Sequence, residues 1–269
     1  MAEALVRADH RHWGAEVVDI RARDLPGLKA AFLVGHVPET GRVLEIGCGE
    51  GKMLRTLAYH RPSLSLDGCD VHQPTSLSRE YCFRLVPGDG TLPYEDGAFD
   101  AVFVSDCLEH VPNPDRYMSE AARVLKSSGR FVACVPTEGQ PLSFYRLYRA
   151  LLGDDLYAVT KEHVQSFSRS SLRALVLRHF MGGVQARYAY HLAGHFMDAT
   201  FFAAQRLAFL RKFWWRDNRY YNPAPANGML TNVLNGLLRL GNAVAWLESR
   251  ALSRIPLTSA AMLIVARKR

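Results

Sequence analysis

A glycine-rich loop that follows a short apolar run constrains this chain more than any other feature. The run covers Val43, Leu44, Glu45 and Ile46, and the glycines are Gly47, Gly49 and Gly51. This pattern predicts a buried strand and a tight loop that opens a helix over Lys52–His60. Glycine permits positive φ and lets a ligand approach bare backbone. The helix N-terminus adds free N–H groups, so the loop is a candidate ligand site.

The glycine spacing excludes two common nucleotide motifs. A dinucleotide fingerprint, G-x-G-x-x-G, needs its third glycine at position 52, where the chain has Lys52. A phosphate-binding P-loop, G-x-x-x-x-G-K-[ST], needs four residues between its glycines and a Ser or Thr after the lysine. Here three residues separate Gly47 from Gly51, and Met53 follows the lysine. The remaining pattern is E-x-G-x-G-x-G, for which a plain strand-to-helix turn is the alternative interpretation.

Further strands follow in an order typical of a doubly wound sheet. Leu64–Asp70 predicts a second strand that ends in an acid. An acid about 20 residues beyond the glycine loop of such a sheet binds the ribose hydroxyls of a ligand. The sequence also predicts strands over Phe83–Val86, Phe99–Val104 and Arg130–Val135, with a helix over Asp115–Leu125.

Four motifs follow one another along the chain: E-x-G-x-G-x-G, F-D-x-V, L-E-H-V and R-V-L-K-x-x-G. Over residues 40–136 this succession resembles the class I S-adenosylmethionine-dependent methyltransferases of the small-molecule, methyltransferase-11-like type. The resemblance implies an α/β fold with a Rossmann-like, doubly wound, seven-stranded sheet whose last strand is antiparallel. It also implies S-adenosylmethionine as cofactor, held by Glu45, Gly47, Gly49, Gly51, Asp70, Val71, Asp89, Gly90 and Ser105. Asp89 would bind the adenine amino group.

The motifs and the resemblance together predict four parts of the chain. These are an N-terminal helical cap (1–40), the methyltransferase core (41–190), an amphipathic helical insertion (191–256) and a final core strand (257–269). No apolar signal core precedes Asp24, and no apolar run reaches 18 residues, so neither a signal peptide nor a membrane span is predicted. Five cysteines without C-x-x-C spacing predict buried, reduced thiols in a cytosolic protein.

The C-terminal third is basic and amphipathic. Residues 191–269 carry 11 Lys and Arg against 3 Asp and Glu, a net charge of +8, whereas the whole chain carries +7. The aromatic residues of this part include Trp214, Trp215, Tyr220 and Tyr221, and a helix over Met229–Leu252 has an apolar stripe of Leu230, Val233, Leu234, Leu237, Leu240, Val244 and Leu247. The stripe either packs on the domain or contacts an anionic membrane surface.

Two histidines are candidate catalytic residues. His110 belongs to the L-E-H-V motif, which the resemblance places near the methyl donor. His163 lies in a segment that covers the acceptor pocket in related enzymes, just before a predicted helix over Arg169–His179 with Ser168 as N-cap. A purely structural role is the alternative for each histidine. Asp106 and Glu109 are expected to orient the loop or the acceptor.

No metal site is predicted from the sequence. His10, His12, His191 and His195 are spaced in pairs, but no acidic or cysteine partner completes a ligand set. Nucleic acid is a less favoured partner. Methylases that act on the amino groups of bases usually carry an Asn/Asp-Pro-Pro-aromatic tetrad after the fourth strand. This chain has Ser105-Asp106-Cys107-Leu108 there.

The sequence therefore predicts a methyltransferase that acts on a small or lipid-like acceptor, such as a quinone precursor, an isoprenoid or a lipid-linked sugar. A general base is needed only when the acceptor is a hydroxyl or a similar weakly acidic group. We expect the protein in the cytoplasm or peripherally on the inner face of the membrane. The alternative is a non-catalytic, cofactor-binding scaffold that docks to a membrane or a protein partner through its basic helices.

Overall fold

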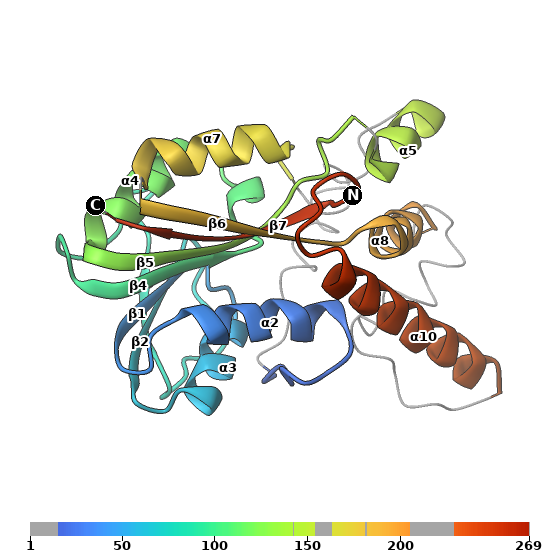
Figure 1. The fold of residues 1–269 in the computed structure, drawn as a ribbon. Helices are drawn as coiled ribbons and strands as arrows, with labels where there is room; N and C mark the ends of the chain where they lie inside the picture. Colours follow the sequence, from blue (N-terminus) through green and yellow to red (C-terminus); the bar gives the residue numbers. More distant parts are fainter. Residues whose placement is uncertain (1–15, 142, 154–162, 181, 205–228, 269) are drawn as a thin grey trace.

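A seven-stranded sheet with helices on both faces forms the body of the molecule (Figure 1). The computed structural model describes residues 16–141, 143–153, 163–180, 182–204 and 229–268. The strands are β1 (Gly41–Ile46), β2 (Leu64–Asp70), β3 (Cys82–Leu85), β4 (Phe99–Ser105), β5 (Leu125–Pro136), β6 (Gly182–Ala189) and β7 (Ala261–Arg267). Their order is β3-β2-β1-β4-β5-β7-β6, and β7 is antiparallel to β5 and β6. The predicted fold, including its antiparallel last strand, is confirmed.

The helices form two covering layers and one separate group. Their bounds are α2 (Leu25–His36), α3 (Lys52–His60), η2 (Leu108–His110), α4 (Pro114–Val124), α5 (Phe144–Leu152), α7 (Arg169–His179), α8 (Leu192–Ala204) and α10 (Met229–Ala251). Helices α4 and α7 cover one face of the sheet, and α2 and α3 cover the other (Figure 1). Helices α5, α8 and α10 gather beyond the carboxyl ends of the parallel strands, on the right in Figure 1.

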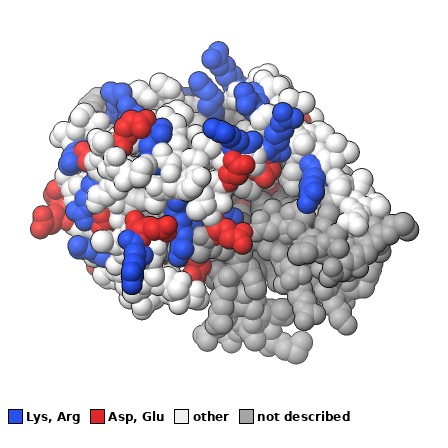
Figure 2. Space-filling view, turned by 90° about the horizontal axis from the view of Figure 1, so that it is seen from below, with Lys and Arg blue, Asp and Glu red and all other residues white. Residues whose placement is uncertain are grey.

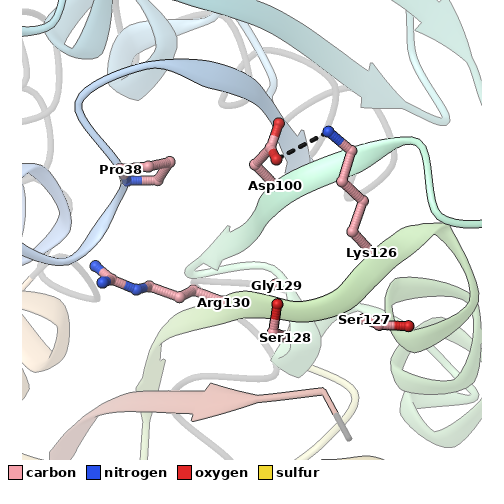
Figure 3. Close-up of a pocket in the computed structure, with 7 residues that line it drawn as sticks. All are labelled: Pro38, Asp100, Lys126, Ser127, Ser128, Gly129 and Arg130. Carbon is pink, nitrogen blue, oxygen red and sulfur yellow. Dashed lines mark hydrogen bonds and ion pairs between the residues drawn. The ribbon is translucent and has the colours of Figure 1, made fainter.

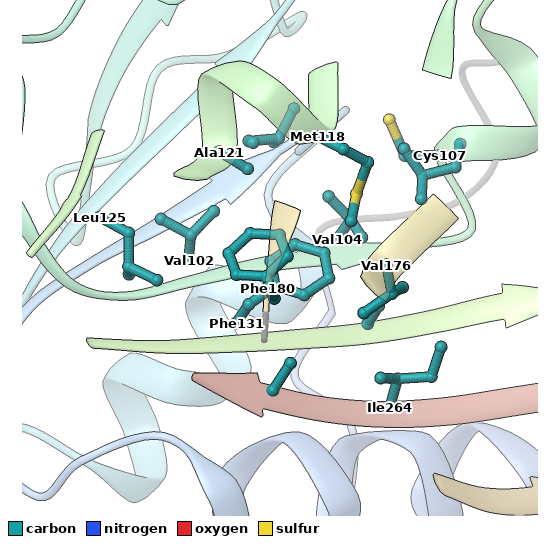
Figure 4. Packing of buried hydrophobic residues seen from close by; sticks show 14 of the residues in the cluster. Val102, Val104, Cys107, Met118, Ala121, Leu125, Phe131, Val176, Phe180 and Ile264 are labelled. Atoms are coloured by element: carbon teal, nitrogen blue, oxygen red, sulfur yellow. The ribbon is translucent and has the colours of Figure 1, made fainter. Parts of the chain in front are cut away.

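Both faces of the central strands are buried, which explains their nearly continuous apolar sequences. On the α4–α7 face, the rings of Phe131 and Phe180 stack with centroids 4.5 Å apart, and Met118 and Val176 pack nearby (Figure 4). On the opposite face, residues of α2 and α3 pack on the strands; this cluster includes Leu33, Val34, Val43, Leu54, Leu57 and Phe103.

The register of the parallel strands aligns their ends. Ile46 of β1 pairs with Cys69 of β2 and with Val104 of β4. The next residue in each chain segment is therefore at the same level, so Gly47, Asp70 and Ser105 lie along one edge of the sheet. This edge, at the carboxyl ends, is where open α/β sheets bind their ligands.

Two local predictions have different outcomes. Ser168 caps α7 as predicted, and a reciprocal bond with Ser171 completes a capping box. All five cysteines are free thiols, but the expectation that all are buried is wrong for Cys82. Cys82 lies on β3, an edge strand of the sheet, which has a neighbour on one side only and so covers its side chains less.

Candidate cofactor and acceptor site

The glycine loop has a backbone that only glycine adopts at low cost. The φ angles of Gly47, Gly49 and Gly51 are 75°, 49° and 81°. A Cβ on Gly47 would lie 2.3 Å from Cys107 Sγ, and one on Gly51 would lie 2.3 Å from the Tyr81 hydroxyl. A Cβ on Gly49 would meet nothing within 4 Å. Gly47 and Gly51 are therefore required by packing, whereas Gly49 borders open space where a ligand can approach the backbone.

Asp70 lies at the end of β2 and is bound to this loop. Its Oδ2 accepts a hydrogen bond from Gly49 N at 2.9 Å, and its Oδ1 accepts one from His72 N at 3.0 Å. Val71, between Asp70 and His72, is exposed. The carboxylate therefore sits beside the open part of the loop, as expected of a group that binds ribose hydroxyls.

Glu45 is a buried carboxyl group beside the same loop. Its side chain is 3% exposed, and its Oε2 has no hydrogen-bond partner among the described residues. Burial and the nearby Asp70 raise the pKa of Glu45 well above its usual value. A buried carboxyl group with an unpaired oxygen suits a ligand that carries a positive charge.

Asp89, which is exposed, and Gly90, which is buried, form a turn next to the end of β2. Asp89 accepts hydrogen bonds from the backbone N and the hydroxyl of Thr91, both at 2.9 Å, and these bonds lower its pKa. Gly90 has a φ of 75° and contacts Tyr117. The turn is positioned because Val86 N donates to Asp70 O at 2.8 Å.

The end of β4 carries a left-handed residue held by an ion pair. Asp106 has a φ of 49°, and Lys29 of α2 binds both of its carboxylate oxygens at 2.6 and 2.7 Å. Burial lowers the pKa of Lys29, but the charge and hydrogen bond of Asp106, together with the nearby Tyr190, outweigh this effect, so the net shift is upward. The ammonium group lies 5.2 Å from the centroid of the Tyr190 ring. Ser105 Oγ lies 3.4 Å from Asp106 Oδ2. Lys29 was not predicted from the sequence.

His110 and His163 come together at the same edge of the sheet. Their ring centroids are 4.9 Å apart and their planes are nearly perpendicular. His163 Nδ1 is hydrogen-bonded to Oε1 of Glu138, a side chain that is 2% exposed. Glu109 is buried, and its Oε1 lies 3.9 Å from His110 Nε2. These four residues are called the His–Glu cluster below.

Backbone contacts tie the two halves of the His–Glu cluster together. Val164 N and Gln165 N both donate to the Glu109 carbonyl at 2.9 Å, so the segment after His163 is bound to η2. Glu138 was missed at the sequence level, although its place directly after the fifth predicted strand, Arg130–Val135, was a usable signal. The role of His110 or His163 as a proton acceptor stays a prediction.

The remaining histidine and aromatic candidates lie elsewhere. His191 Nδ1 is 2.9 Å from the Thr258 hydroxyl, and His195 Nε2 accepts a bond from Tyr145 N at 3.4 Å. Both are buried in and beside α8. His10, His12, Trp214, Trp215, Tyr220 and Tyr221 lie outside the described residues.

A cavity of about 300 Å³ lies at the opposite edge of the sheet (Figure 3). It is lined by the first residues of β4 and β5, and its two cations already have partners. Lys126 pairs with Asp100 at 2.8 Å, and Arg130 donates to the His36 carbonyl. Because ligands of such sheets bind at the carboxyl ends of the strands, this cavity is separate from the candidate site.

Comparison with known proteins agrees with this geometry. A family model described as a methyltransferase domain matches residues 44–133, the segment that holds all of the predicted cofactor residues. Together with the sheet order and the glycine loop, this match identifies the chain as carrying a class I S-adenosylmethionine-dependent methyltransferase domain. Its cofactor is S-adenosylmethionine, and the residues fit that molecule: Asp70 suits its ribose hydroxyls, and Glu45 suits its cationic groups.

Individual relatives share this domain over part of their length. The demethylmenaquinone methyltransferase of Tropheryma whipplei is 36% identical over 130 residues, which cover 45% of this chain and 53% of that protein. The malonyl-[acyl-carrier protein] O-methyltransferase of Geobacter sulfurreducens is 28% identical over 155 residues, covering 55% and 58%. The chain thus spans about half the length of these relatives.

Among solved structures, that of the [4+2]-cyclase SpnF is similar, with a TM-score of 0.56 at 17% identity. The alignment covers 90% of this chain and 80% of that one. At this identity the likeness concerns the fold alone. Since SpnF is a cyclase, the fold by itself does not define the reaction.

Proposed function

We propose that this protein transfers a methyl group from S-adenosylmethionine to a small acceptor with an apolar or lipid-like body. One observation carries the proposal: the cofactor residues at the ends of β1, β2 and β4 share one edge of the sheet with the His–Glu cluster, of which the Glu109, Glu138 and His163 side chains are buried. A domain that only held the cofactor would not need two buried carboxyl groups and two imidazoles beside it, because burying such groups costs free energy.

The chain's own residues then have three tasks. When bound, S-adenosylmethionine supplies an electrophilic methyl group. Gly49 and Asp70 fix the cofactor, and Glu45 pairs with its positive charge. The His–Glu cluster binds and orients the polar end of the acceptor, and the burial of Glu109, Glu138 and His163 helps to keep bulk water away from the reacting atoms.

The relatives support an acceptor that is small or carries an apolar chain. The Tropheryma whipplei protein is named for demethylmenaquinone and the Geobacter sulfurreducens protein for a malonyl group on a carrier protein. For this chain, we propose a quinone precursor, an isoprenoid or a lipid-linked sugar.

Mass spectrometry tests the reaction directly. Lipid and metabolite extracts from cells with and without the gene are compared for a mass difference of one CH2 unit. The purified protein is then incubated with labelled S-adenosylmethionine and the extract from cells that lack the gene. We expect label in the component whose mass changes. Cofactor binding without any labelled product would favour the alternative, a cofactor-binding scaffold without turnover.

A second proposal concerns the membrane surface and rests on α10. Its apolar stripe includes Val233, Leu237, Leu240, Val244 and Leu247, which are 53%, 60%, 63%, 48% and 62% exposed. The interpretation that this stripe packs on the domain is therefore wrong for these five residues. The side of α10 that packs is made of small residues instead: Gly241 contacts Met197 of α8, and Ala245 and Ser249 are buried.

An exposed row of leucine and valine at helical spacing is typical of a helix that lies in a lipid interface. Within the described residues, no helix is long and apolar enough to cross a bilayer. Lys and Arg are interspersed with Asp and Glu on the face shown in Figure 2. We therefore propose that insertion of the apolar side chains of α10 contributes more to membrane binding than the attraction between positive charges and anionic lipid.

Flotation with liposomes tests this second proposal. Binding to anionic liposomes should weaken, without vanishing, as salt rises, because salt screens charge but not apolar insertion. The double variant Leu237→Gln, Leu240→Gln should lose the salt-resistant part. Arg239→Gln, on the same helix, is the control and should retain it. If the wild-type protein does not bind even at low salt, the membrane proposal is wrong and a soluble acceptor becomes the better hypothesis.

A further inference from the structure

Glu109, His110 and His163 present a set of metal-binding atoms that the sequence alone did not predict. One donor atom from each residue lies within 4.8 Å of the other two. Among the described residues, no other group of three or more His, Cys, Asp or Glu side chains has donor atoms this close together. Glu109 and His110 come from η2, and His163 comes from the segment before α7.

Glu138 has the place of an orienting residue behind one of these atoms. It holds His163 through Nδ1, and their side chains are 2% and 7% exposed. Metal-binding histidines nearly always donate their second ring N–H to a carboxylate or a carbonyl, which fixes the tautomer and the ring orientation. In this arrangement Nε2 of His163 is the nitrogen that would bind a cation.

Unpaired carboxylate oxygens provide a second, independent observation. Oε2 of Glu109 and Oε2 of Glu138 are buried without a hydrogen-bond partner among the described residues. Two buried carboxyl groups cost free energy unless a positive charge or a proton compensates them. Lys29, whose ammonium group approaches this region, is bound to Asp106. A divalent cation would compensate both groups at once.

We propose that Glu109, His110 and His163 bind a divalent first-row transition-metal ion, with Glu138 orienting His163. Two imidazoles and one carboxylate suit Mn²⁺, Fe²⁺ or Zn²⁺, whereas Mg²⁺ and Ca²⁺ prefer oxygen ligands. Three atoms that bind one ion at about 2.1 Å lie roughly 3.0–3.6 Å from one another, so side chains whose donor atoms are farther apart than this must move closer on binding.

Three protein ligands leave open coordination positions on such an ion. An oxygen atom of the acceptor, from a hydroxyl, an enol or a carboxylate, would take one of them. This role of the ion rests on the proposed methyl transfer, whereas the binding of the ion does not.

Titration with Mn²⁺, followed by the loss of the free-ion electron paramagnetic resonance signal, tests the site on the full chain. We expect one bound ion per chain, and competition by Zn²⁺ but not by Mg²⁺ at equal concentration. Glu109→Gln and His163→Gln should abolish saturable binding. Glu138→Gln should weaken it by about 10- to 100-fold, the effect typical of an orienting residue.

His179→Gln is the matched control, because His179 of α7 also pairs with a carboxylate, that of Asp115 on α4 at 3.0 Å, outside the His–Glu cluster. It should bind Mn²⁺ like the wild type. S-adenosylmethionine affinity, measured on every variant, reports whether the domain is folded. Absence of saturable Mn²⁺ and Zn²⁺ binding in wild-type protein that binds the cofactor would overturn the metal site and leave the proposed function intact. Binding that survives both Glu109→Gln and His163→Gln would also overturn it. Loss of cofactor binding in the wild type would instead contradict the proposed function.

Discussion

Lys29 and Asp106 form an ion pair that ties α2 to the carboxyl end of β4. Lys29 Nζ lies 2.7 Å from Asp106 Oδ1 and 2.6 Å from Oδ2, and the side chains are 12% and 42% exposed. The pair also holds Asp106 in its left-handed backbone conformation, which a non-glycine residue adopts only at a cost in free energy. Helix α2 is thereby connected to the ligand edge of the sheet.

Replacing Lys29 by Met should therefore destabilise the fold. We expect the free energy of unfolding to fall by about 1–2 kcal/mol, between the values for exposed and for buried ion pairs. Urea denaturation measures this change. Lys29→Arg, which keeps the charge, is the control and should lose less. If Lys29→Met unfolds at the wild-type urea concentration, the ion pair contributes nothing to stability.

Replacing Asp70 by Ala should weaken S-adenosylmethionine binding by about 1–3 kcal/mol, the range for losing charge-assisted hydrogen bonds. Calorimetric titration measures the affinity. Asp115→Asn, at an exposed carboxylate on α4, is the control and should bind like the wild type. Unchanged affinity of the Asp70 variant would remove this residue from the cofactor site.

Two glycine substitutions should separate packing from ligand binding. Gly47→Ala places a Cβ 2.3 Å from Cys107 Sγ, so we expect a large loss of thermal stability. Gly49→Ala meets nothing within 4 Å and should cost only about 1–2 kcal/mol for its positive φ. It should nevertheless reduce cofactor affinity, since its methyl group enters the open space beside Asp70. Thermal melting with and without cofactor distinguishes the two, and equal behaviour of both variants would contradict this assignment.

Glu120 should make stability depend on acid pH. It accepts bonds from Arg123 at 2.7 and 2.9 Å and from Leu92 N at 2.8 Å, and chiefly the Arg123 bonds hold its pKa below the usual value. A lowered folded-state pKa stabilises the fold above the pKa of the unfolded chain, and this contribution is lost as the pH falls through the lowered value.

Glu120→Gln should thus lower the free energy of unfolding at neutral pH by about 1–3 kcal/mol. Its stability should also fall less steeply than that of the wild type between about pH 5 and pH 3. Denaturation at several pH values measures both effects. Glu95→Gln, at an exposed position of the neighbouring loop, is the control. Parallel acid profiles for wild type and Glu120→Gln would contradict the prediction.

The sequence by itself determined the order of the core elements. Strong local signals fixed the strand at residues 43–46, the glycine loop and the helix over Lys52–His60, since apolar runs and glycines act over a few residues. They also fixed Asp70 as a residue that follows a strand, and parallel pairing then brings it level with Gly47. The strand β6 was counted but not located, because its sequence, Gly182–Ala189, mixes polar and apolar residues without a clear alternation.

Only the tertiary structure decided which distant side chains meet. Lys29 and Asp106, or Glu138 and His163, share no local pattern, because their contact depends on where a helix or a loop lies over the sheet. The environment of α10 was also decided by the tertiary structure, because its apolar stripe is compatible both with burial and with lipid contact. The structure buries Ala245 and Ser249 and exposes Leu237 and Leu240, because small residues let α10 approach α8 and α2 closely. Periodicity identifies the faces of a helix, but packing against neighbours selects the face that is buried.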